Sequence, residues 1–230
     1  SELSIDLDGF VTLRGTFEFE EVGDELRITA QGASASLEAG PVLVAATSAD
    51  IGLVLSDAGR VLYARGTFTI TADGLTAGGQ VEVRQNTTST AFTPGSIPAS
   101  GVTVSGIPTI GAGETAFSGT DLHIDVAGFV TLRGSFGFEK PSSTDIRMAV
   151  TGASATLAAG PVSVAATSAQ MGLVLSAAGR VLYAKGTFTV TAPELSASGQ
   201  IEVRQNTTPT DFTAGSIAAS GVTVSAIPTI

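Results

Sequence analysis

Few residues of this sequence could perform acid–base, nucleophilic or metal chemistry. The chain has 230 residues, no cysteine and a single histidine, His123. A catalytic triad needs a base such as histidine beside a nucleophile, and a thiolate zinc site needs cysteine. The position that corresponds to His123 in the other copy of the repeat described below is Ser4, so the two copies share no histidine base. We therefore expect that the chain is not an enzyme.

Asp6 and Asp8 are the best candidates for metal ligands. They stand two residues apart before Gly9, a spacing found in calcium loops, where carboxylate oxygens bind a hard cation. The second copy keeps Asp125 but has Ala127 in place of the second acid. Neither copy has the complete loop pattern with its distant bidentate glutamate. We expect no cofactor and a solvated turn here, with a weak calcium site at these three aspartates as the alternative.

A run of polar residues occurs in both copies. The first copy has Glu82, Arg84, Gln85 and Asn86, and the second has Glu202, Arg204, Gln205 and Asn206. We interpret the run as a cross-strand ion pair on a solvated face, followed by an asparagine that starts a turn. The alternative is a surface for a glycan or a neighbouring subunit. The asparagine also begins an N-glycosylation sequon, a match that we expect to be accidental.

An internal repeat of about 119–120 residues positions all of these side chains. Residues 3–20 match residues 122–139, and after a one-residue insertion the match runs to the end of the chain, with most aligned positions identical. We predict one β module at 1–110 and a second at 120–230, joined by a glycine-rich linker at 111–119. The two copies begin and end at nearly the same positions of the repeat, so we expect further copies on either side.

Each copy alternates apolar and polar residues over long runs, as in 11–20 and 62–71. This period of two predicts antiparallel strands with one buried, apolar face. Turn signals between the runs predict an all-β fold of two tandem antiparallel β-meander modules, sandwich-like or barrel-like. We predict two short strands in 42–55, broken near Ser48. Gly15 and Gly66 fall on the apolar faces and indicate strand curvature rather than a ligand slot.

Charge and composition exclude several classes of partner. The chain has 21 Asp and Glu against 11 Lys and Arg, a net charge of −10. An acidic chain lacks the clustered cations that bind nucleic acid or anionic lipid. No apolar run approaches the roughly twenty residues of a membrane helix, so we expect no membrane insertion. The absence of cysteine favours a large bacterial extracellular or cell-surface protein over a small disulfide-bonded domain.

Two motifs, Leu-x-Ile-Asp-x-x-Gly-Phe-Val-x-Leu-x-Gly-x-Phe and Gly-Arg-Val-Leu-Tyr-Ala, carry a resemblance that covers both copies. Here the chain resembles the tandem β repeats of giant bacterial extracellular adhesin-like or RTX-like proteins. The resemblance implies secretion and a stalk or surface role, and calcium binding is common in such families. The nonapeptide glycine-aspartate repeats of RTX calcium rolls are absent from this sequence.

Three functions fit these patterns. The first is a structural spacer whose partners are neighbouring copies of the same repeat, because duplication adds length without adding a site. The second is an adhesive module that binds a surface glycan or protein with avidity from several copies. The third is a subunit of an extracellular filament or sheath joined through edge strands.

Overall fold

The computed structural model describes residues 2–7, 11–142 and 144–230, and every regular element in them is a β-strand. The prediction of an all-β fold is confirmed. The chain forms two compact units, Ser1–Asp73 with Gly79–Phe117 and Gly74–Gly78 with Ser118–Ile230, here called unit 1 and unit 2. The module boundaries at residues 110 and 120 stay a prediction. The segment predicted as a linker is irregular only up to Glu114, because a strand begins at Thr115.

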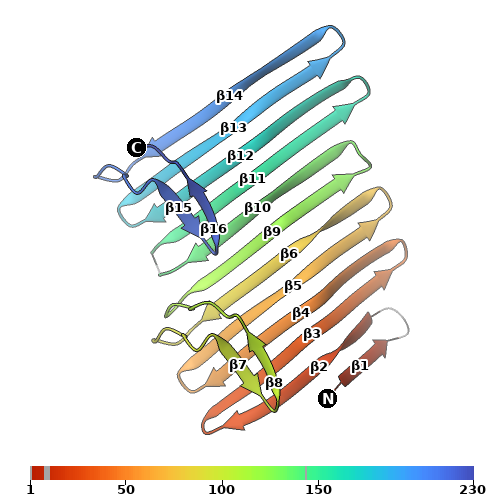
Figure 1. Cartoon of the computed structure of the whole chain (residues 1–230), viewed down its shortest axis with the longest axis vertical. Coiled ribbons are helices and arrows are strands. Elements are labelled where there is room, and N and C mark those ends of the chain that lie inside the picture. The colour runs from red at the N-terminus through yellow and green to blue at the C-terminus, as the bar shows by residue number, and fades with distance from the viewer. Residues whose placement is uncertain (1, 8–10, 143) are drawn as a thin grey trace. The chain divides into compact units, whose positions relative to one another are not determined.

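Unit 1 consists of a meander of long strands followed by a short hairpin (Figure 1). Its strands are β1 (Glu2–Leu7), β2 (Val11–Val22), β3 (Glu25–Ala39), β4 (Val42–Ser56), β5 (Gly59–Ala72), β6 (Leu75–Asn86), β7 (Ser96–Ala99) and β8 (Val102–Ser105). The first four residues of β6 belong to unit 2, and the first three residues of β9 (Thr115–Val126) belong to unit 1.

Unit 2 repeats this order of elements. After β9 it contains β10 (Val130–Lys140), β11 (Ile146–Ala159), β12 (Val162–Ser176), β13 (Gly179–Ala192), β14 (Leu195–Asn206), β15 (Ser216–Ala219) and β16 (Val222–Ser225).

Consecutive strands pair antiparallel, from β1 to β5 in unit 1 and from β10 to β14 in unit 2. The β-branched and aromatic residues at alternate positions favour such extended strands. The segment 42–55 is one strand, so the prediction of two short strands was wrong. Ser48, with φ 53°, forms a β-bulge that shifts the register between Thr47 and Asp50 without ending the strand.

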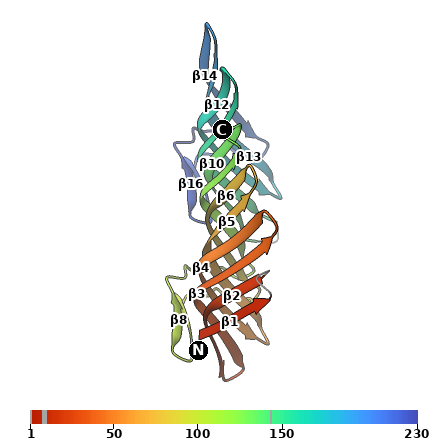
Figure 2. The ribbon, with the colours of Figure 1, turned by 90° about the vertical axis from the view of Figure 1, so that its right-hand side faces the viewer.

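A two-stranded hairpin forms the second layer of each unit. In unit 1 the hairpin β7–β8 packs across β2, β3 and β4, on one side of the meander (Figure 2). Its tip is Ser100-Gly101, and both residues have positive φ, 45° and 95°, as a two-residue turn matched to the strand twist requires. In unit 2 the hairpin β15–β16 packs across β10, β11 and β12. The described strands of neither meander close on themselves, so the barrel-like alternative was wrong.

The hydrophobic core of each unit lies between its hairpin and its sheet. In unit 1 the buried core residues are Val54, Val61, Tyr63, Ile97, Val104, Ile107 and Ile110, with Phe92 packed against them. In unit 2 they are Ala149, Val181, Tyr183, Ile217, Ala219, Val222, Val224 and Ile227, with Val174, Phe212 and Ile230 packed against them.

The hairpin covers the face of the sheet that the alternation marks as polar. Val61 and Tyr63 are buried beneath it, whereas Phe19, on the apolar face, is 62% exposed. The predicted burial of the apolar face was therefore wrong at Phe19, whereas Ala30 on the same face is buried. Next to the turn that joins them, β4 and β5 carry large apolar side chains on both faces of the sheet. The hairpin covers only one of these faces.

A glycine in each sheet provides the contact surface for the hairpin. A Cβ atom added to Gly52 on β4 would lie 2.9 Å from Cδ1 of Ile97 on β7. A Cβ atom on Gly172 would lie equally close, 2.9 Å, to Cδ1 of Ile217 in unit 2. Because any side chain at these positions would occupy the space of the isoleucine, the glycine allows the two layers to pack closely.

Candidate functional site

The structure describes only part of the predicted calcium site. Asp8 lies outside the described residues, as does the side chain of Asp6. Asp125 is described, and its Oδ1 accepts a hydrogen bond of 2.9 Å from the backbone amide of Gly128, three residues on in the same turn. No group of three His, Asp or Glu side chains suited to a metal ion occurs among the residues described. Calcium binding stays a prediction.

The polar run on β6 is more buried than the sequence predicts. Arg84 is 9% exposed and its guanidinium lies between two carboxylates, 3.5 Å from Glu82 and 3.7 Å from Glu114. Glu82 also accepts a 3.0 Å hydrogen bond from the hydroxyl of Tyr63. Glu82 and Arg84 do form an ion pair, but the prediction of a cross-strand pair on a solvated face was wrong, because the pair lies along one strand and Arg84 is buried.

Glu114 is a member of this cluster that the sequence analysis missed. It is 7% exposed and lies in the glycine-rich segment that we interpreted as a linker. Its carboxylate accepts a 2.6 Å hydrogen bond from the Gly111 amide, and its amide donates to the Gly111 carbonyl at 3.1 Å. A lone acid among glycines was the available signal, because glycines permit the tight turn that buries it.

Asn86 holds the chain together where the meander ends. It is 1% exposed, and its side-chain amide donates to the carbonyls of Thr90 (2.8 Å) and Ile110 (3.1 Å). Its Oδ1 accepts from the amide and the hydroxyl of Thr88 at 2.9 and 2.7 Å. Asn206 makes the same four bonds in unit 2. The prediction that the asparagine starts a turn is confirmed.

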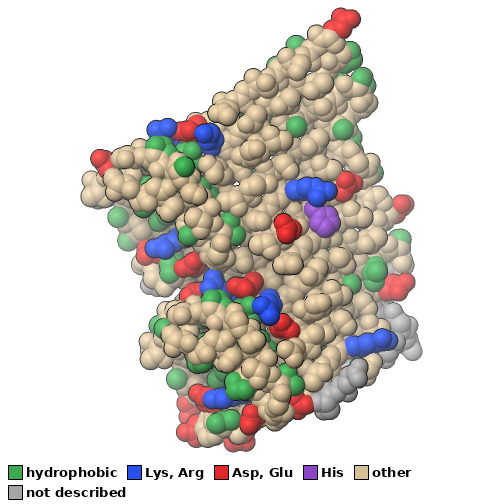
Figure 3. Space-filling view, in the orientation of Figure 1, with side chains coloured by type: hydrophobic (Ala, Val, Ile, Leu, Met, Phe, Trp, Pro, Cys, Tyr) green, Lys and Arg blue, Asp and Glu red, His purple; other side chains and the backbone are tan. Residues whose placement is uncertain are grey.

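The hairpin tip is fastened to β2 by hydrogen bonds that also recur. Ser100 donates from its amide to Glu20 at 2.9 Å and from its hydroxyl to the Phe19 carbonyl at 3.1 Å. In unit 2, Ser220 donates to Glu139 and to the Phe138 carbonyl at 3.1 and 2.7 Å. In each unit, charged side chains gather beside the hairpin (Figure 3). The serine hydrogen bonds fix the hairpin to the sheet at the tip of the hairpin, which is the end of the hairpin layer opposite the asparagine.

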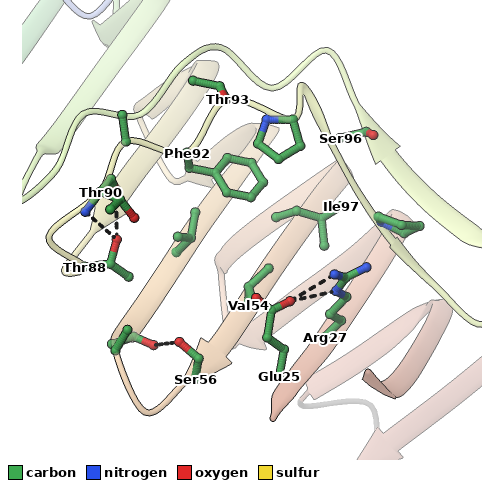
Figure 4. A pocket seen from close by; sticks show the side chains of 16 residues that line it. Glu25, Arg27, Val54, Ser56, Thr88, Thr90, Phe92, Thr93, Ser96 and Ile97 are labelled. Atoms are coloured by element: carbon green, nitrogen blue, oxygen red, sulfur yellow. Dashed lines mark hydrogen bonds and ion pairs between the residues drawn. The ribbon is translucent and has the colours of Figure 1, made fainter. Parts of the chain in front are cut away.

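A pocket of about 560 Å³ opens beside the hairpin of unit 1 (Figure 4). Phe92 and Ile97 form an apolar wall, and Arg27, bonded to Glu25 at 2.9 Å, lies at one side. The matching region of the second copy has different residues at several lining positions: Asp211 replaces Ala91, Ala214 replaces Pro94 and Ala218 replaces Pro98. The pocket lining is therefore less well repeated than the hydrogen bonds that hold the hairpin.

The face opposite the hairpin carries exposed apolar side chains in each unit. Phe19 in unit 1 is 62% exposed, and Leu195 and Ile201 in unit 2 are 58% and 59% exposed. Ile201 and Val203 also line a shallow hollow of about 250 Å³ on this face of unit 2. Apolar surface of this kind is typical of a face that contacts another molecule.

Comparison with known proteins does not identify the chain. No family model, curated protein or solved structure matches it. The described residues contain no helix long and apolar enough to span a membrane.

Proposed function

We propose that the chain is a structural tandem-repeat module, a spacer or stalk segment of a large secreted or cell-surface bacterial protein, without a catalytic role. The observation that carries the proposal is the repetition of the framework contacts. The asparagine bonds and the hairpin-tip bonds recur in both units with the same partners. The best repeated polar contacts are thus those that hold each unit together.

The pattern of differences between the copies supports the same function. A module that binds a ligand through the unit 1 pocket would need that lining in each copy to gain avidity. The lining differs at Ala91, Pro94 and Pro98, while Gly52 and Ile97, which pack the hairpin on the sheet, recur as Gly172 and Ile217. The contacts that hold the framework together recur in both units, as a spacer requires.

Small-angle X-ray scattering on proteins with one, two and three consecutive copies of the 230-residue sequence tests this function. A spacer with defined packing between copies adds the same length with each copy, with or without calcium. A matched series with glycine–serine linkers between the copies supplies the flexible control, whose dimensions grow roughly with the square root of linker length. If the direct series behaves like the linker series, the chain is not a rigid spacer.

A further inference from the structure

The outer edge of β14 has exposed groups whose counterparts in unit 1 are covered. The side chain of Arg204 is 48% exposed, whereas that of Arg84 is 11% exposed. Every residue of β14 from Leu195 to Arg204 is exposed, but the matching strand β6 is half-buried or buried over most of its length. The last strand of the unit 2 meander is therefore an open edge in the described structure.

Unit 1 shows what covers the corresponding groups. The backbone amide of Asn86 donates a 2.9 Å hydrogen bond to the carbonyl of Glu114, and the Glu114 carboxylate lies 3.7 Å from Arg84. From Thr115 the chain continues as an extended strand. No described residue takes the place of Glu114 beside Asn206, and Arg204 pairs only with Glu202 among the described acids.

We propose that the edge of β14 binds an extended segment of the type of residues 111–126, the strand that opens a further copy of the repeat. A carbonyl of this strand accepts the Asn206 amide, and a carboxylate that corresponds to Glu114 pairs with Arg204. Strand addition to an open edge supplies main-chain hydrogen bonds, and the charge pair sets the register. The inference rests on the proposed function at one point: the segment that binds the edge is taken to belong to another copy of the repeat.

The argument for this occupant is charge complementarity at one position. Arg204 has one charged neighbour on its strand, Glu202. In unit 1 the corresponding arginine, Arg84, has a second carboxylate beside it, which the segment at Glu114 supplies. Gly111 and Gly113 in that segment form the turn that presents Glu114, since the Gly111 amide binds the carboxylate.

A synthetic peptide of residues 111–126, added to the 230-residue protein, tests the proposal. We expect saturable binding by fluorescence anisotropy and slower hydrogen exchange at the β14 amides, including Asn206. The Glu114→Gln peptide and the Arg204→Ala protein should each weaken binding about tenfold, the usual weight of a partly buried charged hydrogen bond. A scrambled peptide is the control. Absence of binding, equal binding of all peptides, or protection confined to β1 would overturn the proposal.

A second protein removes the dependence on peptide solubility. Residues 111–126 are appended directly after Ile230, which reproduces the spacing after Ile110 in unit 1. We expect slowed exchange at Asn206 and a higher thermal midpoint than for the same extension with Gln in place of its glutamate. Equal exchange in the two extended proteins would exclude the carboxylate pair. Failure here would leave the scattering test of the spacer unaffected, because other contacts between copies could still make the series rigid.

Discussion

Tyr63 joins the core of unit 1 to its polar cluster. The residue is 1% exposed, and its hydroxyl donates to Glu82. Burial, followed by the charge of Glu82 and the hydrogen bond to it, raises the pKa of Tyr63 from 10.0 to about 12. The folded protein therefore keeps the phenol protonated over a pH range in which the unfolded chain loses the proton.

The raised pKa of Tyr63 predicts a loss of stability at high pH. The contribution is complete below pH 10 and is lost as the pH rises from 10 through about 12, because only the unfolded chain gains from deprotonation in this range. Denaturant unfolding at several pH values should show this fall in the wild type and a smaller fall in Tyr63→Phe. Absorbance titration of Tyr183→Phe, which leaves Tyr63 as the single tyrosine, measures the pKa directly. A midpoint near 10 would contradict the prediction.

Gly52 limits the distance between hairpin and sheet. Gly52→Ala should lower the free energy of unfolding by about 1–3 kcal/mol, because the new Cβ would lie 2.9 Å from Ile97 and overpack the core. Adding Ile97→Val, which removes Cδ1, should restore part of the loss. The control is Gly199→Ala on β14, where an added Cβ meets nothing within 4 Å. Equal stability of the two glycine variants in denaturant unfolding would show that the layers are not in close contact.

At the scale of elements, two sets of hydrogen bonds hold the hairpin layer on the sheet. The asparagine lies where the meander ends, and the serine lies at the tip of the hairpin. The hairpin strands have only four residues each, too few for independent stability. The second layer therefore depends on these anchors and on the apolar core beneath it.

Loss of the Asn86 amide should cost more than an average surface substitution. Asn86→Ala removes one of the two donors to each of the carbonyls of Thr90 and Ile110, and it leaves the Thr88 amide without its side-chain acceptor. The cost is about 2–3 kcal/mol for the loss of this buried network. The matched control is Ser89→Ala, at an exposed position of the same turn. Denaturant unfolding followed by circular dichroism measures both. A change within experimental error for Asn86→Ala would mean that the bonds form equally well with water.

Release of the hairpin tip should be local. Ser100→Ala removes the hydroxyl bond to Phe19 and should cost about 1 kcal/mol. We expect faster hydrogen exchange in β7 and β8 and little change in β4 and β5. Ser105→Ala, at an exposed serine of the same hairpin, serves as the control. Uniformly faster exchange across unit 1 would contradict a separate hairpin layer.

At the scale of the whole molecule, the exposed apolar side chains and the net charge of −10 act in opposite directions. Apolar faces favour association, and like charge opposes it. Added salt screens the charge, so association through these faces should increase with ionic strength.

The apolar faces predict a measurable tendency to associate. Analytical ultracentrifugation over a concentration series at high salt should show association of the wild type. Phe19→Lys and Ile201→Lys should reduce it without loss of stability, because both side chains are largely exposed. Thr69→Lys, at an exposed position on the opposite face of β5, is the control. If the control reduces association as strongly as the two test variants, general charge rather than the apolar face governs the contact.

The sequence by itself determined the repeat, the all-β class and most of the strands, because alternation and turn residues act over a few neighbouring positions. It also marked Asn86 as the start of a turn. Only the tertiary structure decided that the hairpin covers the Tyr63 face and leaves Phe19 exposed, since both faces of β4 and β5 are apolar at their common end. Glu114 was missed for a related reason. Its role depends on Arg84, 30 positions away in the sequence, and local patterns carry no information about which distant strand lies beside a segment.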